Sequence, residues 1–103
     1  MRLGFVILTR NSGRTLEKCL EELEGLKNDF ELEVIIVDGG STDDTLAIVE
    51  NYRNKMNMKV LYDGGNGLGY ARDIGWRASS AEFIVMLDSD VLVNKSFLRK
   101  AIE

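Results

Sequence analysis

Short apolar runs alternate along the chain with longer segments in which apolar residues recur every three or four positions. The first run, residues 3–8, is continuous, which is typical of a parallel strand covered on both faces. Leucines and one cysteine then recur at helical spacing through residues 16–26. Further strands are predicted at residues 33–38, 59–62 and 83–87, each after a helical segment.

The second predicted helix begins near Ser41. The spacing from Ser41 to Asp44 resembles a capping box, in which side chains satisfy the free amides of a first turn. The apolar positions that follow predict that this helix buries Leu46, Val49 and Tyr52.

A glycine-rich stretch, residues 64–69, opens a third predicted helix, and residues 96–103 are predicted to form a fourth. The order βαβαβαβα predicts an α/β fold, a Rossmann-like three-layer sandwich with a mainly parallel sheet and right-handed crossovers. A length of 103 residues fits one domain, residues 1–103.

Composition narrows the function classes. The net charge of −4, without a run of basic residues, argues against a nucleic-acid partner. A single cysteine and no histidine exclude an internal disulfide and the usual zinc sites. The first apolar run is too short to span a bilayer, so we expect a cytoplasmic protein whose membrane association could come only through regions outside this chain.

Acidic residues follow three of the predicted strands, and ligands of open parallel sheets bind beyond the carboxyl ends of the strands. Asp38 follows the second strand, Asp63 the third, and Asp88 and Asp90 the fourth. Each alone could be a turn former or a helix cap. Two carboxylates one residue apart at a strand end can converge on Mg²⁺ or Mn²⁺, which prefer oxygen ligands and share them with phosphates.

Three blocks of sequence resemble the inverting GT-A glycosyltransferases known as family 2. They are residues 5–11, residues 37–45 with Val-Asp-Gly-Gly-Ser-Thr-Asp-Asp-Thr, and residues 67–75 followed by the strand that ends in Asp-Ser-Asp. The resemblance is to the N-terminal, nucleotide-sugar-binding half of the GT-A fold. It implies an enzyme that binds a UDP- or GDP-linked sugar and transfers the sugar to an acceptor hydroxyl of unknown identity.

The resemblance assigns roles at the first two strand ends. Thr9, Arg10 and Asn11 would line the nucleoside pocket, and Asp38 would hydrogen-bond the base.

It also assigns roles at the other two strand ends. Gly67 and Arg72 would border the base and the phosphates. Asp88 would contact the ribose or the metal shell, and Asp90 would ligate the Mg²⁺ or Mn²⁺ that bridges the diphosphate. The metal would offset negative charge on the leaving nucleoside diphosphate.

No residue in this chain matches the general base that an inverting transfer needs, so we identify no catalytic residue. We therefore expect a chain truncated relative to a complete catalytic domain, inactive alone but able to hold a donor. One alternative is a non-catalytic nucleotide-binding fragment that self-associates as a homodimer through an exposed sheet edge. Another is a nucleotidyltransferase-like domain.

Overall fold

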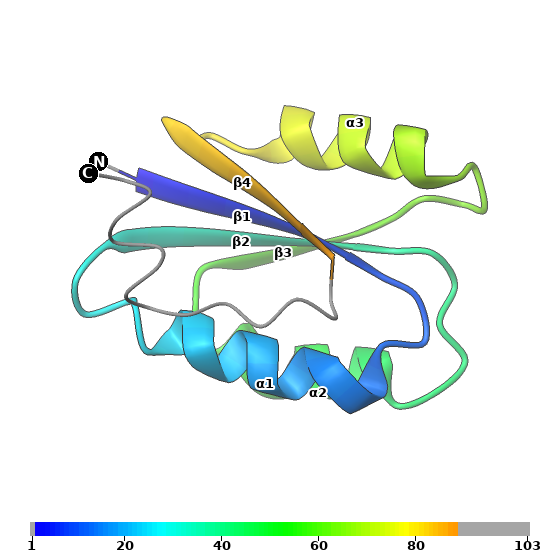
Figure 1. The fold of residues 1–103 in the computed structure, drawn as a ribbon, viewed down its shortest axis with the longest axis horizontal. Coiled ribbons are helices and arrows are strands. Elements are labelled where there is room, and N and C mark those ends of the chain that lie inside the picture. The colour runs from blue at the N-terminus through cyan, green and yellow to red at the C-terminus, as the bar shows by residue number, and fades with distance from the viewer. Residues whose placement is uncertain (1, 89–103) are drawn as a thin grey trace.

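The computed structural model describes residues 2–88, which form a parallel four-stranded sheet with helices on both faces (Figure 1). The elements in chain order are β1 (Arg2–Thr9), α1 (Gly13–Glu24), β2 (Glu31–Asp38), α2 (Thr45–Arg53), β3 (Met58–Tyr62), α3 (Leu68–Ala78) and β4 (Phe83–Asp88). Helices α1 and α2 cover one face of the sheet and α3 covers the other. The predicted three-layer α/β fold is confirmed, while the helix predicted at residues 96–103 lies outside the described residues.

The strand order is β3-β2-β1-β4, with every neighbouring pair parallel. Thr9 at the end of β1 pairs with Asp38 at the end of β2, and Asp38 pairs in turn with Tyr62 of β3. On the other side, Leu8 pairs with Asp88. The chain runs outward from β1 to β3 and then crosses to β4, so the order reverses beside β1, where such sheets bind ligands.

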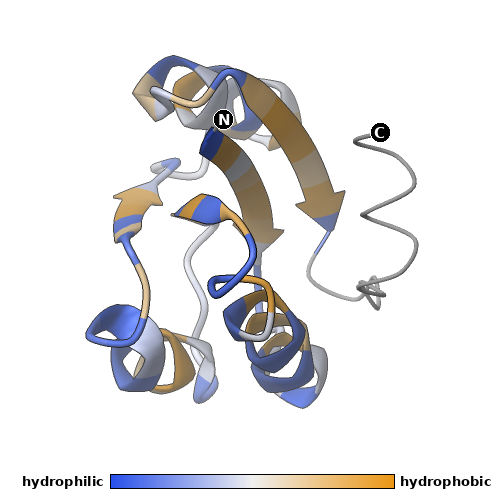
Figure 2. Cartoon of the chain, turned by 90° about the vertical axis from the view of Figure 1, so that its left-hand side faces the viewer, coloured by the Kyte–Doolittle hydropathy of each residue, from blue (hydrophilic) through white to orange (hydrophobic). Residues whose placement is uncertain are grey.

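The larger core lies between the sheet and helices α1 and α2, because both helices turn an apolar stripe toward the strands (Figure 2). Val49 and Tyr52 are buried as predicted. The prediction for Leu46 is wrong, because this side chain is only half-buried and Ile48 takes the inward position. The fully buried side chains of this core include Leu3, Phe5, Ile7, Leu16, Leu20, Leu23, Leu26, Val34 and Ile36.

A smaller core lies between the sheet and α3. Its buried members are Val6, Leu8, Ile35, Val37 and Ala71. A Cβ atom at Gly75 would lie 2.4 Å from Cγ1 of Val6 and 3.2 Å from Cγ2 of Val37. Gly75 therefore allows α3 to approach the two central strands closely enough to fix the helix over the carboxyl half of the sheet.

The predicted capping box before α2 does not form. Helix α2 begins at Thr45, and its N-cap residue Asp44 makes no side-chain capping bond. Instead, Oδ1 of Asp43 accepts a hydrogen bond from the Thr45 amide at 2.9 Å. The Ser41 hydroxyl donates to Asp38 and is therefore engaged at the end of β2 rather than at the helix.

A buried carboxylate also holds the opposite, amino-terminal end of the sheet. Glu33 on β2 accepts hydrogen bonds from the Ser79 hydroxyl and from the amide and hydroxyl of Ser80, and it lies 3.7 Å from Nζ of Lys59. Burial raises the pKa of Glu33, but the serine donors and Lys59 outweigh that effect and lower it below the ordinary value. Glu33 thus ties the α3–β4 connection to β2.

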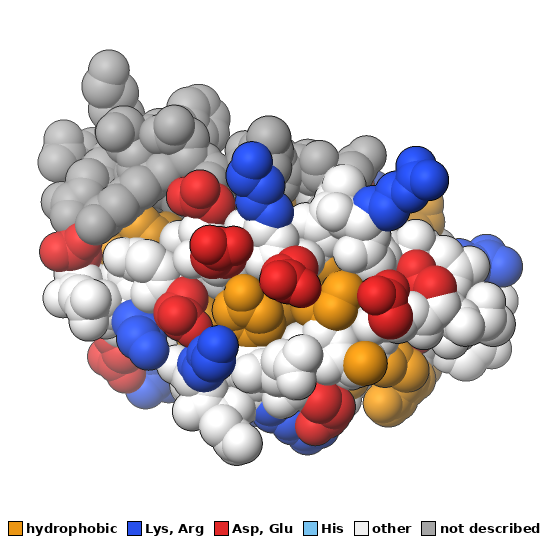
Figure 3. Space-filling model, turned by 90° about the horizontal axis from the view of Figure 1, so that it is seen from below, with side chains coloured by type: hydrophobic (Ala, Val, Ile, Leu, Met, Phe, Trp, Pro, Cys, Tyr) orange, Lys and Arg blue, Asp and Glu red, His pale blue; other side chains and the backbone are white. Residues whose placement is uncertain are grey.

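The solvent side of α1 and α2 carries acidic and basic side chains interspersed with one another (Figure 3). This charged exterior is the counterpart of the apolar stripe that each helix buries. None of the helices in the described part of the chain has the length and apolar character needed to cross a bilayer.

Candidate functional site

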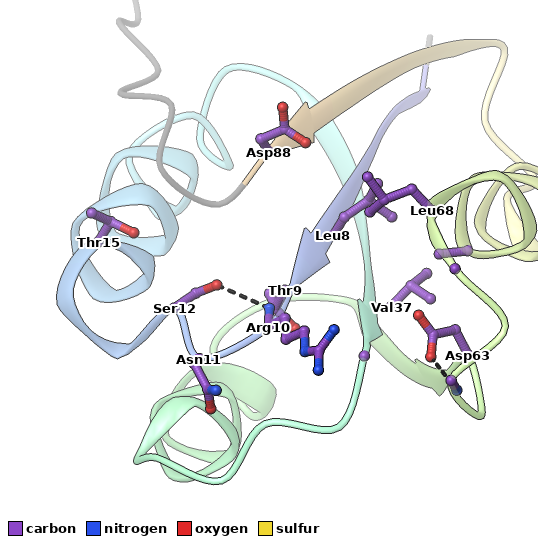
Figure 4. Close-up of a pocket in the computed structure, with 14 residues that line it drawn as sticks. Leu8, Thr9, Arg10, Asn11, Ser12, Thr15, Val37, Asp63, Leu68 and Asp88 are labelled. Carbon is purple, nitrogen blue, oxygen red and sulfur yellow. Dashed lines mark hydrogen bonds between the residues drawn. The ribbon is translucent and has the colours of Figure 1, made fainter.

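A cavity of about 440 Å³ opens at the carboxyl ends of the strands (Figure 4). Its size falls in the range of sites for small molecules and cofactors. It is lined by Leu8, Thr9, Arg10, Asn11, Ser12, Thr15, Val37, Gly39, Asp63, Gly65, Gly67, Leu68, Ala71 and Asp88. The residues come from all four strand ends and from the start of α3, so the fold assembles the cavity from distant segments.

The loop after β1 is fastened to the loop after β2. Asn11 adopts a left-handed backbone conformation with φ of 50°, which asparagine tolerates better than most residues. The backbone amide of Asn11 donates to the Ser41 hydroxyl at 2.9 Å, and the side-chain Oδ1 accepts from the backbone amide of Thr42 at 2.7 Å. The Asn11 side chain therefore holds the two loops together rather than pointing freely into the cavity.

Two further bonds join the same loops at the start of α1. The Ser12 amide donates to the Thr45 hydroxyl at 2.8 Å, and the Gly13 amide donates to Oδ2 of Asp43 at 3.1 Å. The pKa of Asp43 is lowered by the hydroxyl and amide of Thr45. This wall of the cavity is thus built before any ligand binds.

Asp38 organises the end of β2. Its Oδ1 accepts from the hydroxyls of Thr9 at 2.7 Å and Ser41 at 2.6 Å, and its Oδ2 accepts from the amides of Gly40 at 3.0 Å and Ser41 at 2.8 Å. A carboxylate offers about four lone-pair directions, and all are used here. Asp38 is 1% exposed and does not line the cavity, so this geometry gives no support to its predicted bond to the base.

Burial and hydrogen bonding act on Asp38 in opposite directions. Burial raises the pKa of this carboxyl group, but donation from Ser41, Thr9 and Gly40 together outweighs it and lowers the pKa below the ordinary value. Asp38 is therefore held as an anion inside the protein.

Asp63 is the second buried carboxylate at this end of the sheet, and it faces the cavity. Its Oδ1 accepts from the Gly65 amide at 2.8 Å, while Oδ2 accepts no hydrogen bond from residues 2–88. Its backbone is fixed on both sides, because its amide donates to the Asp38 carbonyl at 3.1 Å and its own carbonyl accepts from Asn66. The position of this carboxylate is thus set by the loop and leaves one oxygen available.

The loop that carries Asp63 depends on glycine. Gly64, Gly65 and Gly67 have φ values of 63°, 78° and 91°, in the region that disfavours side chains. These three bends turn the chain from β3 into α3 and place Leu68 on the cavity wall. The glycine-rich stretch is therefore a shaped wall of the cavity.

The structure brings most of the predicted site residues together. Those that line the cavity are Thr9, Arg10, Asn11, Gly67 and Asp88. Arg72 is exposed on α3 outside the cavity wall, one position after Ala71. Asp90 lies outside the described residues, so its predicted role as a metal ligand stays a prediction.

The sequence placed Asp63 in the cluster of polar groups at the strand ends, but we assigned it no binding role. We also missed Ser12 and Thr15, which line the cavity from the start of α1. The signal for Asp63 was its position before two glycines, where a side chain can bond the turn and still face outward.

The charged groups of the cavity lie apart. Asp63 and Asp88 stand at the ends of the two edge strands, β3 and β4, on opposite sides of the cavity (Figure 4). Three strand spacings separate these strands, or about 14 Å. Arg10, at the end of the central strand β1, forms no ion pair with residues 2–88. This arrangement suits an elongated polar ligand with an anionic part.

The fold and the cavity define a doubly wound α/β protein with a cavity of small-molecule size at its switch point. The chain belongs to glycosyl transferase family 2, whose model matches residues 5–103. Membership of this family decides against the nucleotidyltransferase-like alternative.

The relatives include the poly(ribitol-phosphate) beta-N-acetylglucosaminyltransferase TarS of Staphylococcus aureus, 40% identical over 106 residues. That match covers 98% of this chain and 18% of TarS. The structure of S. aureus TarS 1-349 in complex with UDP-GlcNAc superposes with a TM-score of 0.85 at 39% identity, over 99% of this chain and 30% of that one. Chondroitin synthase of Pasteurella multocida is 33% identical over 86% of this chain and 9% of its own length. The chain thus spans less than a fifth of the length of these curated relatives.

Proposed function

We propose that this chain is the donor-binding part of an inverting glycosyltransferase that uses a UDP-linked sugar and a divalent cation. The observation that carries the proposal is the cavity at the switch point, with Asp88 at one end and a polar loop wall at the other. The chain matches, at 39% identity, a structure in complex with UDP-GlcNAc, and this match favours uridine over guanosine as the nucleoside of the donor.

In this proposal the nucleoside lies along the ends of β1 and β2 and extends toward the loop after β3. Thr9, Arg10 and Asn11 form that wall, and their loop is already fixed by its bonds to the loop after β2. A preformed wall lowers the ordering cost of binding. The Arg10 guanidinium supplies the positive charge in the cavity that an anionic donor requires.

The chemistry of Asp88 fits a hard cation. Asp88 is exposed at the end of β4 and lines the cavity, and Mg²⁺ sites commonly use one or two carboxylates together with substrate phosphates. Asp88 and Asp90 would hold Mg²⁺ or Mn²⁺, which when bound would offset the charge of the departing nucleoside diphosphate. Transfer also requires an acceptor hydroxyl and a base that deprotonates it. We propose these for the whole enzyme.

Calorimetric titration with UDP, UDP-GlcNAc and GDP, with and without Mn²⁺, tests the proposal. We expect UDP to bind more tightly than GDP, and to bind about 10-fold or more weakly without the cation, because unscreened phosphates meet Asp88. Asp88→Asn should remove most of the gain that Mn²⁺ provides.

Glu82→Gln is the matched control, because Glu82 is an exposed carboxylate just before the amino end of the same strand. It should bind UDP with Mn²⁺ as the unchanged protein does. Equal affinity with and without Mn²⁺ would contradict the metal site. Absence of binding by every nucleotide in a folded protein would contradict the donor site.

A further inference from the structure

Asp63 is a buried charged acceptor on the cavity wall whose bonding capacity is incomplete. Asp63 is 7% exposed, its Oδ1 is committed to the Gly65 amide, and its Oδ2 receives no hydrogen bond from the described residues. A buried anion with an open lone pair is costly unless a donor completes it. A ligand or water in the cavity can supply that donor, because this residue forms part of the cavity wall.

The neighbouring loop explains why Oδ2 has room to face that space. A Cβ atom added at Gly39 would lie 3.3 Å from Oδ2 of Asp63, so the absent side chain leaves the carboxylate its position. Asp38, one residue earlier, turns inward and is saturated by its own loop. Of the two buried aspartates at these adjacent strand ends, only Asp63 can accept from a ligand.

The surroundings of Asp63 suit a flat heterocycle. Val37 and Leu68 lie on the same side of the cavity as Asp63 (Figure 4), and Ala71 also lines the cavity. Apolar walls with one precisely placed polar group are the usual means of orienting an aromatic ligand. Asp88 lies at the far edge strand, where the diphosphate is proposed to bind, so the base of an extended nucleotide falls on the Asp63 side.

We propose that Asp63 is the residue that selects the base of the donor, by accepting the N3–H of uracil on Oδ2. This inference rests on the proposed function and deepens it. A carboxylate accepts and cannot donate, so it discriminates between bases by their hydrogen-bond pattern. Uracil presents an N–H at position 3, whereas cytosine presents a lone pair there and would face the carboxylate with repulsion.

Nucleotide analogues test the contact in the unchanged protein, without any risk to folding. We expect UDP, with Mn²⁺ present, to bind about 10- to 100-fold more tightly than 3-methyluridine diphosphate or CDP, the range for a hydrogen bond to a charged group. Calorimetry measures all three dissociation constants.

Asp63→Asn then assigns the discrimination to this residue. The amide oxygen can still accept from Gly65, while the amide NH₂ replaces the open acceptor with a donor. We expect UDP to weaken by about 10-fold or more and CDP to gain, so that the preference for UDP over CDP falls or inverts. The preference for UDP over its 3-methyl analogue should disappear, as a double-mutant cycle would show.

Asp73→Asn is the control, since Asp73 is an exposed carboxylate on α3 outside the cavity. It should retain both preferences, and circular dichroism should show the fold of each variant. If Asp63→Asn and Asp63→Ala both bind UDP but keep the full preference over the 3-methyl analogue, another group reads N3 and the inference is overturned. That result leaves the donor site intact, whereas a folded, unchanged protein that binds no nucleotide overturns both.

Discussion

The loops after β2 and β3 each begin with a buried aspartate, yet they use it in opposite ways. Asp38 accepts four hydrogen bonds from its own and the neighbouring loop and is closed to ligands. Asp63 accepts one and faces the cavity. The sequence block that most resembles the family contains the aspartate that builds the scaffold, while the aspartate outside the blocks faces the proposed ligand. The strength of a motif therefore does not tell whether its aspartate faces the cavity.

The largest expected effect separates the two aspartates by stability. Asp38→Asn places an amide NH₂ against either two hydroxyls or two backbone amides that now donate to the carboxylate, and it removes the charge that strengthens all four bonds. We expect the free energy of unfolding to fall by about 2–4 kcal/mol. Urea denaturation followed by circular dichroism measures the loss.

Asp63→Asn is the matched comparison, since it makes the same chemical change at the adjacent strand end. It keeps its bond to Gly65 and leaves no donor unpaired, so we expect a change below about 1 kcal/mol. Equal losses for the two variants would show that Asp63 is as much a part of the scaffold as Asp38, and the comparison would fail.

Much of this architecture was predictable from the sequence, because each continuous apolar run is typical of a buried strand and each apolar stripe has the spacing of a helix. The register that places Asp38 beside Thr9 follows from strand pairing, which no local pattern states. Whether a strand-end aspartate faces inward depends on donors elsewhere in the chain, here Thr9 and Ser41. The capping box before α2 failed for the same reason, since a tertiary partner competed for Ser41. The open side of Asp63 depends on the absence of a side chain at Gly39, which becomes visible only once the loops are adjacent.

We expect acid to disrupt the hydrogen bonds of the buried carboxylates before it affects the packing of the core. The pKa of Asp38 is lowered in the folded protein, so its contribution is complete above the ordinary carboxyl pKa of about 4 and is lost as the pH falls through the folded value. Glu33, whose pKa is also lowered, acts in the same direction at the other end of the sheet. We expect urea midpoints to decline between about pH 5 and pH 2, and less steeply in Asp38→Asn. An identical slope in that variant would mean that Asp38 does not bind fewer protons when folded.

The smallest expected effect lies where the two loops meet, at Gly39. Gly39→Ala adds a Cβ atom 3.3 Å from Oδ2 of Asp63 and 3.6 Å from Cδ of Arg10, while the backbone bond from its amide to the Thr9 carbonyl is kept. The crowding is slight, so stability should change by less than about 1 kcal/mol. The open oxygen must shift by a few tenths of an ångström, however, and we expect the dissociation constant for UDP to rise by about 3-fold.

The control for Gly39→Ala is Gly69→Ala, because a Cβ atom at Gly69 meets no atom within 4 Å and the residue is already helical. It should leave UDP binding unchanged. In an Asp63→Ala background the penalty of Gly39→Ala should vanish, since the oxygen that it crowds is gone. If the dissociation constant for UDP still rises in that background, Gly39→Ala acts through Arg10 or through the loop itself. The difference between Asp38, which is closed to ligands, and Asp63, which faces the cavity, would then not depend on the absence of a side chain at Gly39.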